Sequence, residues 1–233
     1  MRWLGYIQLT LSERIINLSE SLYAGSESVN NDPQKESLGI FPHSWTELRA
    51  GRVPGNIPIW VGILSELTEF GIFFVAYFIA KYHYPEAFSL GPQSVSTASG
   101  VLNTLILLSS SYFMAKAMIN IRLDNLRKSE RYLWLTFSCG CLYLMVKTGE
   151  FYWNDLQGFS TNTSEFFTIY YYMTFNHFLH VGWAACAILW VIFRLRKGGY
   201  SAKQHSGLEA LAMYWHMIDL MWILIFPLLY VLR

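Results

Sequence analysis

Five long runs of apolar residues, separated by short polar links, dominate the chain after residue 54. They extend over Ile59–Ala80, Ala98–Ile121, Tyr132–Trp153, Phe166–Phe193 and Leu208–Val231. About 20 helical residues cross the hydrocarbon core of a bilayer, so each run is long enough to span a membrane. A transmembrane β-strand needs only about half that length and alternates in polarity, which these continuous runs do not. The pattern predicts an all-α integral membrane bundle of five transmembrane helices.

The first 53 residues follow a different pattern. Leucine and isoleucine recur there at spacings of three and four, at Leu4, Ile7, Leu11, Ile15, Leu18 and Leu22. This spacing predicts an N-terminal amphipathic helix that lies on the membrane surface or docks on a partner, with a loosely ordered extension as the alternative. Glu13 and Arg14 interrupt the apolar core that a signal peptide would need. We therefore expect a cytoplasmic extension over residues 1–53 and a transmembrane domain over residues 54–233.

Lysine and arginine fall unevenly on the two sides that five spans define. Of the 17 such residues, only Lys81 and Arg233 lie on the side opposite the N-terminus, and Lys147 lies within a span. The other 14 lie on the N-terminal side or, for Lys116, can reach it from the end of a span. Since cytoplasmic loops are enriched in Lys and Arg, the bias predicts a cytoplasmic N-terminus and a periplasmic C-terminus.

Composition supports a membrane protein and excludes several other classes. Apolar residues make up 53% of the chain and charged residues only 14%, compared with about 25% charged residues in soluble domains. The net charge of +1 and the absence of long basic tracts argue against nucleic-acid binding. Cys139, Cys141 and Cys186 all lie within apolar runs, a pattern that predicts neither a disulfide framework nor a zinc site.

Ionisable residues inside the predicted spans are the main candidates for chemistry. They form pairs three residues apart, which places each pair on one face of its helix: Glu66/Glu69, Lys147/Glu150, His177/His180 and His216/Asp219. Charges within a bilayer are expensive and face protein, water or a counter-charge. We expect an intramembrane polar network, structural or proton-related, made of Glu66, Glu69, Asn103, Lys147, Glu150, His177, His180, His216 and Asp219. In it, Lys147 and Glu150 form an ion pair, and Asn103 offers a hydrogen bond between helices.

Three other interpretations of these residues remain open. The imidazoles of His177, His180 and His216 are the ligand type of a membrane metalloenzyme or a b-type cytochrome. An intramembrane carboxylate such as Glu66 is the usual proton carrier of a proton-coupled transporter. However, the sequence lacks a rich set of histidine boxes, an inverted repeat and a helix broken mid-membrane. We therefore expect no catalytic, cofactor-binding or metal-binding residue in this chain.

Motifs in the five spans, taken in order, resemble the last five helices of the cytochrome c oxidase subunit III family. They are Ser65-Glu66 with Phe73-Phe74, Leu102-Asn103-Thr104, Gly149-Glu150-Phe151-Tyr152, His177-Phe178-Leu179-His180-Val181 and Tyr214-Trp215-His216-Met217-Ile218-Asp219. The family's larger members have two further helices before these five. The segments Glu165-Phe166-Phe167 and Phe226-Pro227-Leu228-Leu229-Tyr230 are closest to the five-helix NorE-type branch, which is associated with nitric oxide reductase.

This resemblance implies a non-catalytic accessory subunit of a respiratory haem–copper oxidoreductase in the bacterial inner membrane. Haem and copper or iron are then expected in a subunit I-type partner, and this chain binds none of them. Its implied roles are to support assembly, stability and proton-coupled electron transport, and bound phospholipid is possible. The network residues, including Glu66, His177 and Asp219, are implied to be internal contacts.

Overall fold

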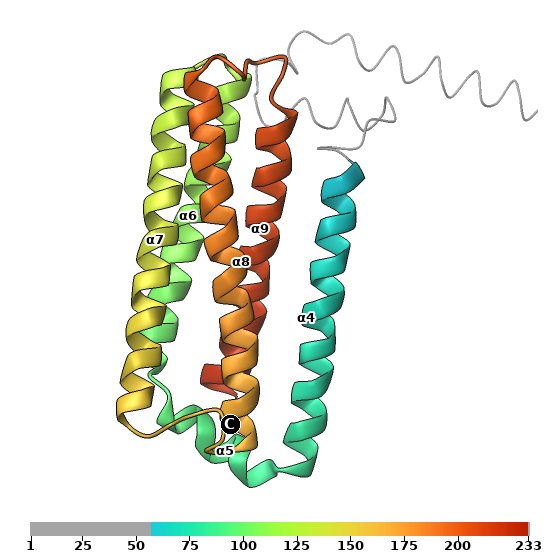
Figure 1. Cartoon of the computed structure of the whole chain (residues 1–233), viewed down its shortest axis with the longest axis vertical. Coiled ribbons are helices and arrows are strands. Elements are labelled where there is room, and N and C mark those ends of the chain that lie inside the picture. Colours follow the sequence, from blue (N-terminus) through green and yellow to red (C-terminus); the bar gives the residue numbers. More distant parts are fainter. Residues whose placement is uncertain (1–56, 233) are drawn as a thin grey trace, which may run out of the picture. The chain divides into compact units, whose positions relative to one another are not determined.

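The computed structural model describes residues 57–232, and these residues form an all-helical structure (Figure 1). Its elements are α4 Ile57–His83, α5 Pro85–Ser94, α6 Thr97–Arg122, α7 Leu126–Leu156, α8 Glu165–Arg196, α9 Ser206–Phe226 and the π-helix η1 Pro227–Val231. The predicted amphipathic helix and the predicted division near residue 53 fall on or beside residues outside this range, so both stay predictions.

Four of the predicted spans are confirmed as long apolar helices. The segments Pro58–His83, Thr97–Arg122, Glu165–Arg196 and Ser206–Val231 are each long and apolar enough to cross a membrane. The fifth predicted span, residues 132–153, lies within α7, which is 31 residues long but less apolar than the other four. Charged and hydroxyl-bearing side chains lower the hydropathy of α7, and the count of five spans stays a prediction.

Helices α6, α7, α8 and α9 pack around a common core, and α4 lies along α8 and α9 (Figure 1). The core of this bundle is strongly aromatic and includes the buried side chains of Tyr143, Trp215 and Trp222. The neighbouring rings meet edge-on, as Tyr143 and Trp222 do at 5.3 Å between centroids. Such contacts add to the stabilisation from apolar burial, because the positive edge of one ring meets the negative face of the other.

A short helix, α5, lies between α4 and α6, where the sequence pattern predicts only a polar link. Pro85 begins it, at the helical position where its missing N–H costs nothing. Phe88 is fully buried against Tyr77 and Phe166, with centroids 5.1 and 5.6 Å away. A Cβ atom on Gly91 would overlap the ring of Phe166, so glycine permits this close approach of α5 to α8.

Capping and backbone geometry explain where the long helices begin and end. The side chains of Ser96 and Ser164 accept hydrogen bonds from backbone N–H groups in the first turns of α6 and α8. Gly158 and Gly198 follow α7 and α8 with φ of 80° and 75°, a conformation that glycine adopts without strain. Pro227 lies directly after α9, where η1 begins, so proline does not interrupt the helix interior.

Candidate functional site

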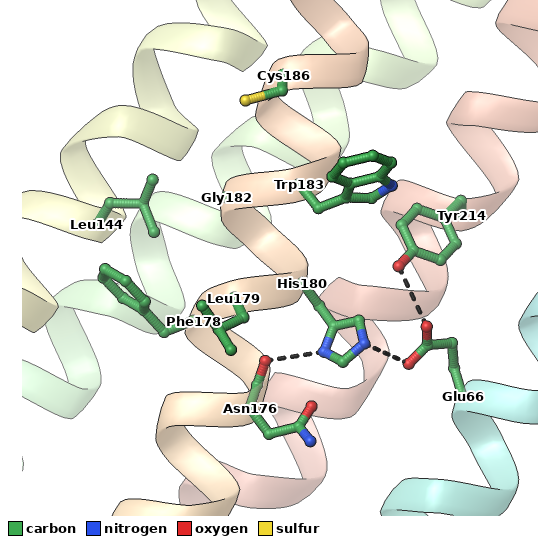
Figure 2. A pocket seen from close by; sticks show the side chains of 10 residues that line it. All are labelled: Glu66, Leu144, Asn176, Phe178, Leu179, His180, Gly182, Trp183, Cys186 and Tyr214. Atoms are coloured by element: carbon green, nitrogen blue, oxygen red, sulfur yellow. Dashed lines mark hydrogen bonds and ion pairs between the residues drawn. The ribbon is translucent and has the colours of Figure 1, made fainter.

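The first polar contact of the network joins α4 to α8. Glu66 Oε2 lies 2.7 Å from His180 Nε2, and the other nitrogen of that ring, Nδ1, lies 2.8 Å from the Asn176 carbonyl oxygen (Figure 2). A carbonyl oxygen only accepts, so Nδ1 carries a proton and donates it. The Nε2 nitrogen faces the Glu66 carboxylate, and the two groups form an ion pair when the ring is protonated. The Tyr214 hydroxyl, on α9, donates to Glu66 Oε1 over 3.4 Å.

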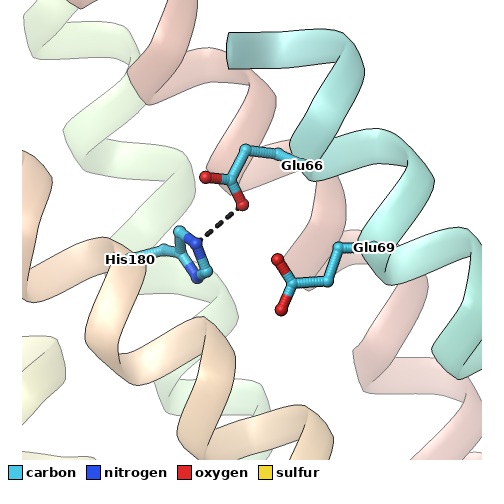
Figure 3. A group of neighbouring side chains, drawn as sticks. All are labelled: Glu66, Glu69 and His180. Atoms are coloured by element: carbon cyan, nitrogen blue, oxygen red, sulfur yellow. Dashed lines mark ion pairs between the residues drawn. The ribbon is translucent and has the colours of Figure 1, made fainter.

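Glu69 lies three residues beyond Glu66 on α4 and also faces α8 (Figure 3). Its carboxylate accepts a hydrogen bond from the side-chain amide of Asn176. Ligand-type atoms of Glu66, Glu69 and His180 lie within 4.8 Å of one another, so their spacing is compatible with a metal ion. Two of these three groups are already paired with each other, and the third is bonded to Asn176. Each of these three side chains therefore has a protein partner among the described residues.

An open pocket of about 740 Å³ lies beside the Glu66–His180 contact (Figure 2). Glu66, Asn176, His180 and Tyr214 supply its polar lining, and most of the remaining wall comes from apolar side chains of α7 and α8. In a membrane, such a pocket presents a few hydrogen-bonding groups within an otherwise hydrocarbon-like surface.

A second polar cluster is fully enclosed between α6, α7, α8 and η1. Lys147 Nζ and Glu150 Oε2 are 3.3 Å apart and buried, so the predicted ion pair is present. Lys147 donates to the hydroxyls of Tyr170 and Tyr230 over 3.1 and 2.6 Å. Those hydroxyls in turn donate to Glu150 Oε1 over 2.5 and 2.6 Å, and Ser99 donates to Oε2 over 2.6 Å. Each charge is thus compensated by hydrogen bonds as well as by its counter-ion.

Sequence reasoning missed three partners in this cluster: Ser99, Tyr170 and Tyr230. Tyr170 belongs to a run of three tyrosines that reads as an interfacial anchor, yet it is fully buried, while Tyr172 is 64% exposed. Helical periodicity offered a signal, since Phe166, Tyr170 and Thr174 recur every four residues on the buried face of α8. Nothing in the local sequence marked Tyr230, whose position depends on η1.

The predicted pairing of His216 with Asp219 is not found. His216 Nδ1 instead lies 2.6 Å from Ser111 Oγ, a contact that joins α9 to α6. The Asp219 carboxylate is buried and makes no hydrogen bond to another described residue by distance and angle. A shared helix face therefore does not ensure contact between two side chains three residues apart.

Asn103 and His177 are also buried, but neither makes a hydrogen bond to a described residue. The hydrogen bonds between α6 and α9 come from neighbouring positions instead. Trp222 Nε1 donates to Thr104 Oγ1 over 2.9 Å, and Trp215 Nε1 donates to Ser110 Oγ over 3.0 Å. His177 packs against aromatic rings and His180 faces Glu66, so the two histidines occupy different environments.

Comparisons with known proteins identify the family. The family model for cytochrome c oxidase subunit III matches residues 55–232. The chain is 34% identical to cytochrome c oxidase subunit 3 of Thermostichus vulcanus, over 74% of this chain and 84% of that protein. It is 23% identical to cytochrome bo(3) ubiquinol oxidase subunit 3 of a Buchnera aphidicola strain, over 74% of this chain and 83% of the relative.

A third relative is a longer protein. Haem–copper oxidase subunit I+III of Aeropyrum pernix is 29% identical over 74% of this chain, which corresponds to 22% of that protein. The family match covers nearly all of the described helices, including every residue of the predicted polar network. The chain therefore belongs to the cytochrome c oxidase subunit III family.

Proposed function

We propose that this chain is a non-catalytic accessory subunit of a haem–copper respiratory oxidase in the bacterial inner membrane. The observation that supports this most directly is the family match over residues 55–232, together with relatives named as subunit 3 of cytochrome c and ubiquinol oxidases. Its partner is a subunit I-type protein that contains the haem and the copper or iron. The Aeropyrum relative, named subunit I+III, is consistent with such a pairing.

The contacts of the polar network fit a structural role in this proposal. Glu66 connects α4 with α8 through His180, and Glu150 connects α6, α7, α8 and η1 through hydroxyl groups. Hydrogen bonds between transmembrane helices typically contribute about 0.6 kcal/mol and at most about 1.7 kcal/mol each. Several such bonds around one buried ion pair fix the register of the helices without any prosthetic group. The chain would thus offer a rigid surface to its partner and to phospholipid.

The proposal includes α7 as a fifth membrane span. Within residues 132–153 of α7, the two charged residues, Lys147 and Glu150, are buried and face the bundle interior. Its outward-facing side chains are mostly apolar and include Leu135, Leu142, Met145, Tyr152 and Trp153. A helix with this arrangement is compatible with lipid on its outer surface. With five spans, the Lys and Arg bias places the N-terminus in the cytoplasm and the C-terminus in the periplasm.

Cysteine labelling tests the five-span topology. In a background where the three native cysteines are replaced, Ser160→Cys lies in the α7–α8 link and Ser201→Cys in the α8–α9 link. A membrane-impermeant maleimide added outside intact spheroplasts should label Ser160→Cys but should reach Ser201→Cys only after permeabilisation. Equal labelling of both positions from the outside would contradict a membrane-spanning α8. Labelling of Ser201→Cys alone would mean either that α7 does not cross the membrane or that the orientation is reversed.

Co-purification tests the proposed complex. A tagged full-length chain, extracted in mild detergent from its native membrane, should bring down a haem-bearing subunit, detected by its Soret absorbance and by peptide mass spectrometry. The chain alone, separated from the complex, should be colourless and free of stoichiometric iron and copper. A Soret band in the isolated chain that disappears in His180→Ala or His216→Ala would favour a b-type cytochrome instead. Transport by the purified chain in proteoliposomes, lost in Glu66→Gln, would favour a transporter.

The NorE-type branch, with a nitric oxide reductase as partner, is a finer version of the same proposal. It rests on the segments around Phe166 and Pro227 that resemble this branch. The identity of the co-purified catalytic subunit distinguishes an oxidase partner from a nitric oxide reductase partner. An oxidase partner contains copper beside its active-site haem, whereas a nitric oxide reductase partner contains non-haem iron, so metal analysis of the complex decides between them.

A further inference from the structure

Besides Asp219, three buried polar side chains inside the bundle lack hydrogen-bond partners among the described residues. They are Asn103 on α6, Tyr143 on α7 and His177 on α8, which we call the inner polar layer. All three are fully buried, and the Asn103 amide oxygen and nitrogen, the Tyr143 hydroxyl and both His177 ring nitrogens are without a bonded neighbour. Since buried polar atoms in native proteins are almost always bonded to protein or to ordered water, these five atoms need an explanation.

The three side chains lie at the same level of the bundle. The centroids of the Tyr143 and His177 rings are 5.6 Å apart. The centroid of the Trp222 ring lies 5.3 Å from that of Tyr143 and 5.2 Å from that of His177. Trp222 is bonded to Thr104, the residue that follows Asn103. The alignment of α6 with α7 also places Asn103 beside Tyr143. A hydrogen bond from Ser129 on α7 to the Ala117 carbonyl on α6 fixes this alignment. Asn103 lies 14 residues before Ala117 and Tyr143 lies 14 residues after Ser129, close to four turns in each helix.

The chemistry of the layer matches water. The Asn103 side chain both donates and accepts, as does the Tyr143 hydroxyl, and a neutral imidazole has one donor and one acceptor nitrogen. Water offers two donors and two acceptors and commonly bonds to about three buried polar groups. The surrounding side chains of Phe70 and Trp222 are aromatic, so a large or charged ligand would gain little there.

We propose that α6, α7 and α8 enclose a bound water site formed by Asn103, Tyr143 and His177. The water joins the three helices at a level where direct hydrogen bonds between them are lacking. This level lies between the Lys147–Glu150 cluster and the Ser111–His216 contact, so polar contacts then connect the helices at three successive depths. The site lies in the interior of this chain, so the proposal does not depend on which complex the chain joins.

Radiolytic labelling of the full-length chain in nanodiscs tests the site. Short X-ray pulses convert bound water to hydroxyl radicals, which oxidise the side chains beside it, and labelling in ¹⁸O-water identifies the source of the oxygen. Tyr143 should be oxidised in a dose-dependent way despite its complete burial. Asn103→Leu and the double variant Asn103→Leu/His177→Leu remove polar partners of the water and should lower the rate at Tyr143 several-fold. The rate at Tyr82, which is 83% exposed, should stay unchanged in both variants.

Two results would overturn the proposal. One is a Tyr143 oxidation rate that is equally low in the wild type and in Asn103→Leu, with the exposed Tyr82 labelled normally. The other comes from an experimental density map at a resolution that shows ordered water. There we expect a peak at about 2.7–3.2 Å from both Asn103 and His177. A direct hydrogen bond between Asn103 and His177 or Tyr143, with no density between them, would show that the layer is dry. The map is obtained from the wild type, so this test can be made even if a substitution prevents folding.

Discussion

The Tyr230 hydroxyl, in the π-helix that begins at Pro227, donates to Glu150 Oε1 on α7 over 2.6 Å and accepts from Lys147 Nζ over 2.6 Å. One hydroxyl thus connects both members of a buried ion pair to the C-terminal end of the described chain. Because the π-helix directly follows α9, this contact also determines how the last span ends against α7. Tyr230 is therefore a position at which loss of a single hydroxyl should affect the bundle.

Tyr230→Phe should therefore destabilise the bundle. The substitution keeps the ring but removes one donor to Glu150 and one acceptor for Lys147, and loss of a hydrogen bond to a buried charged group costs about 1.5–3 kcal/mol. Reversible unfolding of the reconstituted chain would measure the change. Tyr82→Phe is a matched control, since Tyr82 is 83% exposed and should leave the free energy of unfolding within about 0.5 kcal/mol of wild type. Equal stability of the two variants would argue against the Tyr230 contacts.

Removal of one member of the Lys147–Glu150 pair should cost more than removal of both. Lys147→Met leaves the Glu150 carboxylate buried without its counter-ion, and breaking a buried pair in this way typically costs about 3–5 kcal/mol. Lys147→Met combined with Glu150→Gln removes both charges and should recover a large part of that loss. A double-mutant cycle on unfolding free energies measures the coupling. Additive effects of the two substitutions would mean that the two side chains do not interact.

The Glu66–His180 contact should hold α4 against α8. We expect a coupling energy of about 0.6–1.7 kcal/mol from a cycle of Glu66→Gln and His180→Leu, as for other hydrogen bonds between transmembrane helices. Because the two side chains satisfy each other, treatment with a chelator should leave the unfolding transition of the wild type unchanged. A lower unfolding temperature after chelation, restored by one divalent ion and absent in Glu69→Gln, would show a metal at this cluster.

Much of the helical architecture could be predicted from the sequence, because continuous apolar runs need no tertiary information. The helix α5 was missed, since its prolines and polar residues resemble a turn and its stability depends on the burial of Phe88. Spacing of three residues correctly predicted the Lys147–Glu150 ion pair, but it also suggested a His216–Asp219 pair that does not form. Spacing along one helix defines a face, whereas the partner on the neighbouring helix depends on packing.

Ser111→Ala tests the pairing of His216. From the sequence alone, Asp219→Leu is expected to destabilise the bundle by leaving His216 without its partner, but the structure gives that role to Ser111. Ser111→Ala should therefore destabilise the bundle by about 0.6–1.7 kcal/mol, the usual contribution of a hydrogen bond between transmembrane helices. Ser109→Ala is the matched control, because Ser109 is exposed and its hydroxyl donates to the Leu105 carbonyl of the same helix. Since Asp219 makes no hydrogen bond to His216, the loss caused by Ser111→Ala should persist in an Asp219→Leu background. If Ser111→Ala caused no further loss of stability in the Asp219→Leu background, the result would favour Asp219 as the partner of His216.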